Sequence, residues 1–257
     1  MKNIGLTLFC AALTLTAFAQ EKPKQSRFRY QTTMTLLSTV VDSRVEDLFY
    51  NGTESVYVTY APKPSQLPDT TVMKGDTRLT IEQVDFGDGK DFTVYQNFRT
   101  GKMDLRTVFS NGKICIVHDD VPKLDWQLEP EKKRIGPYEC QKATTTFRCA
   151  KYTVWFTTAI PLSIGPAKLS GLPGLIVEAL NERNDVSYKL LTADYPSTAK
   201  PYIIAPPKTG DQEYSFEAFR QIETVEADKV AKFIAASAED PQNPPMITPT
   251  AECLTNK

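Results

Sequence analysis

IPLSIGPAKLSGLPGLI, residues 160–176, is the most informative stretch of this chain. It places three glycines and three prolines among aliphatic side chains. Glycine permits positive φ and close backbone approach, whereas proline fixes φ and lacks an N–H donor, so the expected path is irregular. Exposed connecting segments are ordinarily polar, and this one is not. We therefore predict that it crosses a sheet and presses its aliphatic side chains onto the core: Leu169, Leu172, Leu175 and Ile176.

The first residues have the pattern of an export signal. A lysine, an apolar run over residues 4–15 and a small-x-small site at residues 17–19 predict a signal peptide over residues 1–19. The residue before Cys10 does not suit lipoprotein anchoring, so the expected mature chain starts at Gln20 without an anchor. No later apolar run is long enough to span a membrane. The predicted location is the periplasm, the outer envelope or the exterior.

Charge and length limit the classes of partner and the number of domains. The chain has 30 Lys and Arg against 31 Asp and Glu, a net charge of −1, with no basic block. Nucleic acid and anionic membrane surfaces are therefore unlikely partners on composition alone. The length suits one β-rich domain over residues 20–240, followed by a Pro-rich tail over residues 241–257.

Short runs of alternating, β-branched and aromatic residues predict an antiparallel sheet. The predicted strands cover residues 28–36, 45–50, 55–60, 78–86, 92–98, 103–109, 113–118, 126–128, 134–147, 151–159, 175–180 and 186–195. Asn51-Gly52 predicts a hairpin turn, Arg148-Cys149 a tight turn, residues 129–133 a polar turn and residues 62–76 a surface loop. The expected fold class is mainly β, a strongly curved antiparallel sheet of about ten to twelve strands.

The periodicity changes near Ser215, a candidate helix N-cap. Apolar residues then recur at three- and four-residue steps, which predicts a C-terminal helical segment. A break near Thr224 is an alternative to one continuous helix. We expect the helix to cover one end or the concave face of the sheet.

The expected mature chain contains four cysteines: Cys115, Cys140, Cys149 and Cys253. In an exported protein they can form disulfides, with three connectivities. Cys140 and Cys149 lie on one strand and its turn, roughly 25 Å apart when extended, which is too far for a bridge. We favour Cys115 with Cys140 and Cys149 with Cys253. The alternative is that some are small buried side chains.

The search for catalytic and metal-binding residues yields one weak candidate. His118 is the only histidine, and Asp119 and Asp120 follow it. Ser110 or Cys115 could act with His118 as nucleophile and base, but no nucleophile elbow is present. The same histidine and carboxylates could hold a metal, although three adjacent residues are few ligands. An imidazole at a strand end beside solvated carboxylates is the simpler interpretation, and no cofactor is expected.

Aromatic residues offer a candidate ligand groove. Trp126, Trp155 and Phe156 lie on neighbouring predicted strands and could line an apolar groove, although ordinary core packing is the simpler interpretation. Glu129-Pro130-Glu131 is interpreted as a solvated turn rather than a catalytic carboxylate pair.

Several passages together resemble the GLPGLI family of exported Bacteroidetes proteins. The matching residues are Trp126-x-Leu128, Arg134-Ile135-Gly136-Pro137-Tyr138-x-Cys140, Tyr152-x-x-Trp155-Phe156-Thr157, Ile160-Pro161, Gly165-Pro166 and the motif Gly171, Leu172, Pro173, Gly174, Leu175, Ile176. Cys149 departs from the glycine usual in that turn. The resemblance implies an exported β-rich protein of largely unassigned function and carries no catalytic residue. By analogy of architecture, the expected fold is similar to that of outer-membrane lipoprotein carriers, a half-open barrel with an apolar concave face.

The sequence therefore favours a non-enzymatic binding or carrier protein of the cell envelope. Its expected partner is an apolar ligand or an exported polypeptide. One alternative is an envelope hydrolase that uses the His118 region or paired carboxylates. Another is a structural accessory of an outer-membrane complex.

Overall fold

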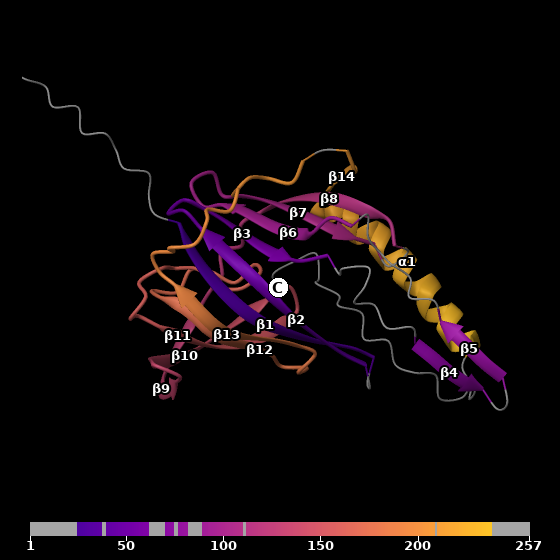
Figure 1. Cartoon of the computed structure of the whole chain (residues 1–257), viewed down its shortest axis with the longest axis horizontal. Helices are drawn as coiled ribbons and strands as arrows, with labels where there is room; N and C mark the ends of the chain where they lie inside the picture. Colours follow the sequence, from indigo (N-terminus) through magenta and orange to yellow (C-terminus); the bar gives the residue numbers. More distant parts are fainter. Residues whose placement is uncertain are drawn as a thin grey trace, which may run out of the picture.

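The computed structural model describes residues 25–37, 40–61, 70–74, 77–81, 89–109, 112–208 and 210–237. The predicted signal peptide and Pro-rich tail lie outside these residues. The described elements are numbered in Figure 1. They are β1 (Ser26–Leu37), β2 (Val40–Tyr50), β3 (Glu54–Thr59), β4 (Thr70–Lys74), β5 (Thr77–Ile81), β6 (Phe92–Asn97), β7 (Lys102–Val108), β8 (Ile114–Asp120), β9 (Gln127–Ile135), β10 (Tyr138–Phe147), β11 (Ala150–Thr157), β12 (Leu175–Asn181), β13 (Val186–Asp194), β14 (Gln212–Ser215) and α1 (Phe216–Ser237).

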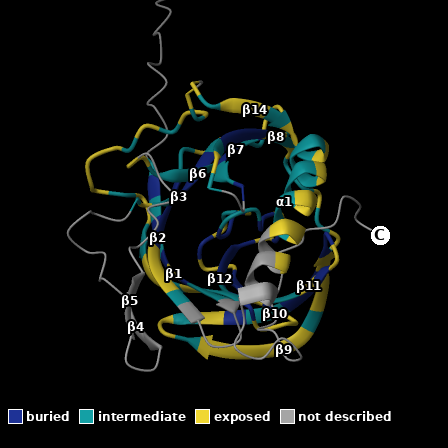
Figure 2. Cartoon of the chain, turned by 90° about the vertical axis from the view of Figure 1, so that its right-hand side faces the viewer, coloured by how far each residue is buried: buried dark blue, intermediate teal, exposed yellow. Residues whose placement is uncertain are grey.

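Twelve of the strands form one sheet in the order β14-β8-β7-β6-β3-β2-β1-β13-β12-β11-β10-β9. Neighbouring strands are antiparallel, except that β14 runs parallel to β8. Figure 2 shows the strands following one another around a ring, with α1 beside the gap between β8 and β11. The predicted fold class, a mainly β curved sheet with a C-terminal helix, is confirmed. No helix among the described residues has the length and apolarity needed to cross a membrane.

The turns at Asn51-Gly52 and Arg148-Cys149 are confirmed. The Asn51 side-chain carbonyl accepts hydrogen bonds from the backbone N–H of Thr53 and Glu54, at 3.1 and 2.8 Å. Arg148 and Cys149 have φ of 48° and 64°. Two successive positive φ values match the right-handed twist of the flanking strands, so this hairpin turns tightly without a glycine.

The predicted turn over residues 129–133 is wrong, because these residues lie inside β9. The chain turns instead at Gly136, where φ is 55°. Lys142 on the adjacent strand forms ion pairs with Glu129 and Glu131, at 3.1 and 3.0 Å. Charged residues and Pro130 are tolerated in β9 because it is the last strand of the sheet. The backbone N–H and C=O groups on its outer edge therefore need no partner strand.

Three further predictions need correction. Residues 70–74, predicted as loop, form β4, which pairs with β5 as a separate hairpin outside the main sheet. The short parallel strand β14 was not predicted. The helix continues through Thr224, whose hydroxyl donates a hydrogen bond to the Arg220 carbonyl at 2.8 Å, so the side chain is satisfied without a break.

One row of side chains, running across the strands, lies on the concave face of the sheet. The strand registers align Phe28, Leu48, Tyr57, Val94, Leu105 and Val117 across β1, β2, β3, β6, β7 and β8. One end of this row packs against Ile160 and Ile164, and the other end packs against Phe216 and Phe219 of α1. The segment before β12 and the helix therefore share one face of the sheet, each covering a different part of it.

Residues 158–174, which we call the crossing, pack on the part of the concave face that extends from β3 to β10 in the strand order. The four aliphatic side chains predicted to be buried, Leu169, Leu172, Leu175 and Ile176, are all at most 3% exposed. Backbone hydrogen bonds satisfy the irregular path: Leu175 N donates to Ile160 O and Ile176 N to Ile164 O. Tyr30 and Trp126 donate side-chain hydrogen bonds to the carbonyls of Ile176 and Ser170, both at 2.8 Å. An irregular segment is buried here because its polar groups have partners.

The convex face carries a buried carboxylate. Asp47 on β2 has a fully buried side chain that accepts hydrogen bonds from Arg27 (2.6 Å), Arg29 (3.0 Å) and Tyr60 (2.7 Å). Burial alone raises the pKa of the Asp47 carboxyl, but the hydrogen bonds from Arg27, Arg29 and Tyr60 outweigh burial and lower its pKa below the ordinary value. The ionised carboxylate therefore stabilises the folded state.

We expect Asp47→Ala to lower the free energy of unfolding at neutral pH by about 2 kcal/mol. This is less than the roughly 3–5 kcal/mol typical of fully buried pairs, because both guanidinium groups are partly exposed. Because the folded pKa is depressed, the contribution is present above the unfolded pKa of about 3.9 and is lost as pH falls through the folded value. The urea midpoints of wild type and variant should therefore converge in acid. Asp228→Ala, which removes an exposed ion pair, is the control. If the difference in urea midpoint between wild type and Asp47→Ala did not change with pH, the ionised Asp47 carboxylate would not be the source of the stability.

Candidate functional site: the cleft beneath the helix

Helix α1 is attached to the concave face by its first two turns. The Ser215 hydroxyl accepts a hydrogen bond from the Ala218 backbone N–H at 3.2 Å, which confirms the predicted N-cap. Phe216, Phe219 and Ile222 then pack against the cluster around Val117 and Cys115 on β8. The next apolar residue of the helix, Val225, is 53% exposed. Val225 therefore does not extend the contact that Phe216, Phe219 and Ile222 make with the sheet.

A cleft of about 230 Å³ lies between α1 and strands β7 and β8. Its walls combine apolar side chains of both strands with the aromatic side chains of the helix: Leu105, Val108, Val117, Phe216 and Phe219. Ligand pockets for drug-sized molecules usually measure roughly 300–1,000 Å³. The volume of this cleft therefore suits a single slender apolar group.

Basic side chains surround Phe216 at the edge of this cleft. The Arg148 guanidinium carbon lies 3.4 Å from the centre of the Phe216 ring, and Lys168 Nζ lies 5.8 Å from it. Lys168, Arg220 and Glu223 line the cleft itself. Arg148 comes from the β10–β11 turn, Lys168 from the crossing and Arg220 from α1. Three segments far apart in the sequence thus bring cations to one place.

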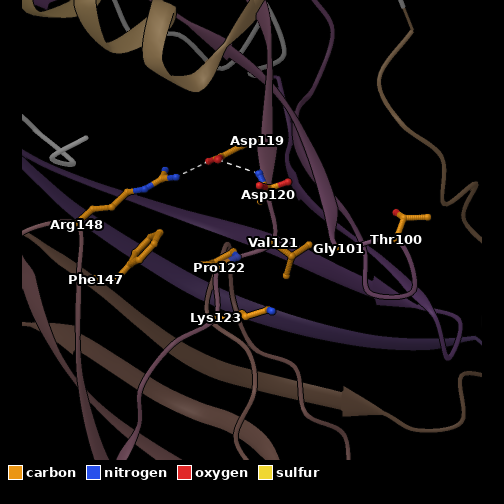
Figure 3. Close-up of a pocket in the computed structure, with 9 residues that line it drawn as sticks. All are labelled: Thr100, Gly101, Asp119, Asp120, Val121, Pro122, Lys123, Phe147 and Arg148. Atoms are coloured by element: carbon orange, nitrogen blue, oxygen red, sulfur yellow. Dashed lines mark hydrogen bonds and ion pairs between the residues drawn. The ribbon is translucent and has the colours of Figure 1, made fainter. Parts of the chain in front are cut away.

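A second cleft of about 440 Å³ lies on the Asp119 side of Arg148. Figure 3 shows Arg148 and Asp119 pointing toward each other, and their closest atoms are 2.6 Å apart. This ion pair connects the β10–β11 turn to the end of β8, while Arg148 also stacks on the helix. The two ends of the half-open sheet are therefore joined through one guanidinium group.

The structure does not bring His118, Asp119 and Asp120 together as a metal site. His118 Nδ1 is 2.7 Å from Asp104 and Nε2 is 3.3 Å from Glu213, whereas Asp119 pairs with Arg148 and Asp120 with Lys102. The hydrogen bond with Asp104 is the main cause that raises the pKa of His118. Within the described residues, no group of histidine, cysteine and acidic side chains is arranged to hold a metal.

The pair of Cys115 and His118, considered for nucleophilic catalysis, is also not assembled. Side chains three residues apart on a strand point to opposite faces, and Cys115 is buried under α1 while His118 is half exposed. Burial raises the pKa of the Cys115 thiol to about 12, so it is not a thiolate at neutral pH. Ser110 lies outside the described residues.

The predicted bridge between Cys115 and Cys140 is wrong, because both are free buried thiols. They belong to β8 and β10, which are not neighbouring strands in the sheet. Cys149 is disulfide-bonded. Its pairing with Cys253 stays a prediction.

The three aromatic residues considered as ligand-lining do not share a groove. Phe156 is buried in the cluster with Leu172, and Trp126 packs against that cluster. Trp155 alternates with Phe156 along β11 and points to the other face, where Lys133 Nζ lies 4.3 Å from its ring centre. The helix cleft was not predicted from the sequence, because Phe216 and Phe219, which line it, were interpreted only as part of the apolar face of a helix.

Comparisons with known proteins give limited further information. Residues 146–178 match a family model described as "Protein of unknown function (Porph_ging)", a stretch that includes the crossing. A search of proteins with curated descriptions found no significant match.

Among solved structures, PNGF-II is similar at 13% identity with a TM-score of 0.48, over 79% of this chain and 34% of that one. This chain thus spans about a third of PNGF-II. A DUF1329 family protein from Desulfovibrio piger is similar at 9% identity (TM-score 0.28, 64% and 69% of the two chains). A domain described as outer membrane lipoprotein-sorting, from Vibrio parahaemolyticus, is similar at 8% identity (TM-score 0.25, 67% and 86%). None of these similarities carries a function over to this chain.

Proposed function

We propose that this chain is an exported, non-enzymatic binding or carrier protein of the cell envelope that holds an apolar ligand beneath α1. The observation that carries the proposal is the cleft of about 230 Å³ between α1 and the sheet, with apolar walls on both sides. Removing apolar ligand surface from water there is favourable by about 25 cal/mol per Å². A slender apolar chain fits this volume better than a folded polypeptide segment.

The attachment of α1 supports reversible binding. Phe216, Phe219 and Ile222, in the first two turns of the helix, contact the cluster on β7 and β8, and Val225 after them is 53% exposed. Opening the cleft at this end of the helix requires these contacts to separate. The crossing, by contrast, is held by backbone hydrogen bonds and buried side chains. We therefore assign the helix as the movable wall and the crossing as the fixed one.

We expect Thr107→Trp to abolish ligand binding by filling the cleft. Thr107 lines the cleft from β7 and is only partly buried, so an indole can enter without replacing a core residue. The uncharged dye N-phenyl-naphthylamine, displaced by dodecanol, provides the measurement. Wild type should show saturable fluorescence enhancement, and the variant should lose it by at least about tenfold in affinity, the loss expected when a few buried CH₂ groups no longer fit.

Thr192→Trp is the matched control, because Thr192 is exposed on β13, outside the cleft. Circular dichroism and the thermal midpoint should show that both variants are folded. Absence of saturable dye binding by the wild type would refute the proposal. Equal binding by Thr107→Trp and wild type would refute this location for the ligand.

A further inference from the structure

We propose that the ligand is a single-chain carboxylic acid whose carboxylate binds the Arg220 guanidinium while its tail occupies the cleft. This inference rests on the proposed function, and it adds the chemical class of the ligand. Its evidence is an unsatisfied nitrogen, the charges around the cleft and the volume available.

Arg220 carries a buried donor without a hydrogen-bond partner in the described part of the chain. Its Nε atom is inaccessible to solvent and makes no hydrogen bond there. A buried donor that lacks a partner is unfavourable by about 1–3 kcal/mol, more when charged, and native structures rarely retain one without a reason such as an absent ligand. Arg220 also lines the cleft, so a ligand that displaces the movable helix wall can bring an acceptor to this nitrogen.

The helix presents this donor beside the apolar walls. Phe216, Phe219, Arg220 and Glu223 are spaced at i, i+3, i+4 and i+7, which places them on one face of α1. All four line the same cleft. An amphiphile with an acidic end and an apolar chain matches this combination, because its two ends meet a guanidinium and phenyl rings respectively.

The surrounding charges favour a monoanion. Arg148 and Lys168 flank the Phe216 ring, at 3.4 and 5.8 Å, so two cations adjoin the cleft that Arg220 lines. Glu223 contributes one negative charge to the same lining. Because Arg148 is already paired with Asp119, the charged side chains that line the cleft sum to +1, which one carboxylate neutralises and a dianionic phosphate would exceed. The volume of about 230 Å³ admits one chain rather than the paired chains of a phospholipid.

The test compares dodecanoate with dodecanol at pH 8, each displacing N-phenyl-naphthylamine from wild type, Arg220→Met and Lys232→Met. Methionine keeps an unbranched stem but removes the guanidinium, and Lys232 is an exposed cation on the same helix. Wild type should bind dodecanoate about tenfold or more tightly than dodecanol, as expected for a charge-assisted hydrogen bond. Arg220→Met should bind the acid and the alcohol with equal affinity, whereas Lys232→Met should behave as wild type. Dodecyl phosphate should bind wild type less tightly than dodecanoate.

The outcomes separate the two proposals. Equal affinity of wild type for acid and alcohol, or a preference that persists in Arg220→Met, would overturn the carboxylate assignment and leave the apolar cleft intact. Failure of both ligands to bind wild type would overturn the proposed function together with this inference. If Arg220→Met does not fold, Arg220→Lys is measured instead. Lysine retains the positive charge but lacks the Nε donor, so this variant should keep only part of the preference for dodecanoate over dodecanol.

Discussion

Gly174→Ala is expected to lower the free energy of unfolding by about 3 kcal/mol, at the upper end of the usual range for overpacking. A Cβ at this position would lie 2.1 Å from the carbonyl oxygen of Thr157 and 2.7 Å from its carbonyl carbon. Those atoms belong to the backbone at the end of β11, which pairs with β12. Because backbone cannot rotate away as a side chain can, the crossing and β11 must separate. Thermal and urea unfolding measure the effect.

Gly136→Ala is the matched control for Gly174→Ala. Gly136 has a φ of 55° and nothing within 4 Å of the position a Cβ would take, so its substitution introduces backbone strain without a clash. We expect a loss of about 1 kcal/mol there, the usual energy of a left-handed L-residue. If Gly174→Ala were no more destabilising than Gly136→Ala, the close approach of the crossing to β11 would be wrong.

Leu172→Asp is expected to lower the free energy of unfolding by about 4 kcal/mol or more. The Leu172 side chain is 1% exposed and packs in the cluster with Phe156, Leu169 and Ile176. Removing a buried leucine alone is unfavourable by about 2–5 kcal/mol, and an introduced carboxylate adds the loss of its hydration. With total stabilities of roughly 5–15 kcal/mol, the variant should be largely unfolded at elevated temperature.

Two further variants separate the causes of this loss. Leu172→Ala removes the packing without adding charge and should retain a cooperative transition at a reduced midpoint. Leu128→Asp places the same carboxylate on β9, where the leucine is 53% exposed, and should change stability little. An unchanged midpoint for Leu172→Asp would mean that the crossing is not packed on the sheet.

These variants also bear on the cleft, because the crossing supplies Lys168 to its lining. A change that displaces the crossing should weaken dodecanoate binding, even though Gly174 and Leu172 do not line the cleft. Thr107→Trp and Arg220→Met act on the cleft directly. Stability and binding measured on the same proteins therefore separate loss of the fold from loss of the site.

Much of the fold could be predicted because its signals are local. Alternation of apolar and polar residues, as in β7, follows from the pleat of a strand and needs no knowledge of its neighbours. The turn at Asn51-Gly52 follows from the conformations those two residues favour. The burial of Leu172 was predictable because a segment so apolar and so rich in glycine and proline is unsuited to solvent.

The wrong predictions concern residues whose structure depends on contacts with residues far away in the sequence. Residues 129–133 read as a turn, yet pairing with β10 and ion pairs to Lys142 hold them as a strand. Strand β14 has only four residues, and its parallel position beside β8 depends on the returning chain. Cys115 and Cys140 were paired from the number of cysteines and the expected export, although both are free, buried thiols on strands that are not neighbours in the sheet.

The sequence by itself determined a curved, mainly β fold, a helix after Ser215 and a buried crossing with glycines where the backbone is close-packed. These features follow from interactions over a few residues, so pattern and propensity suffice. Only the tertiary structure decided the candidate site. Arg148, Lys168 and Arg220 lie on a turn, the crossing and the helix, and a net charge of −1 gives no sign that they meet. Which charged side chains lie close together depends on how the sheet curves, because that curvature brings together segments that are far apart in the sequence.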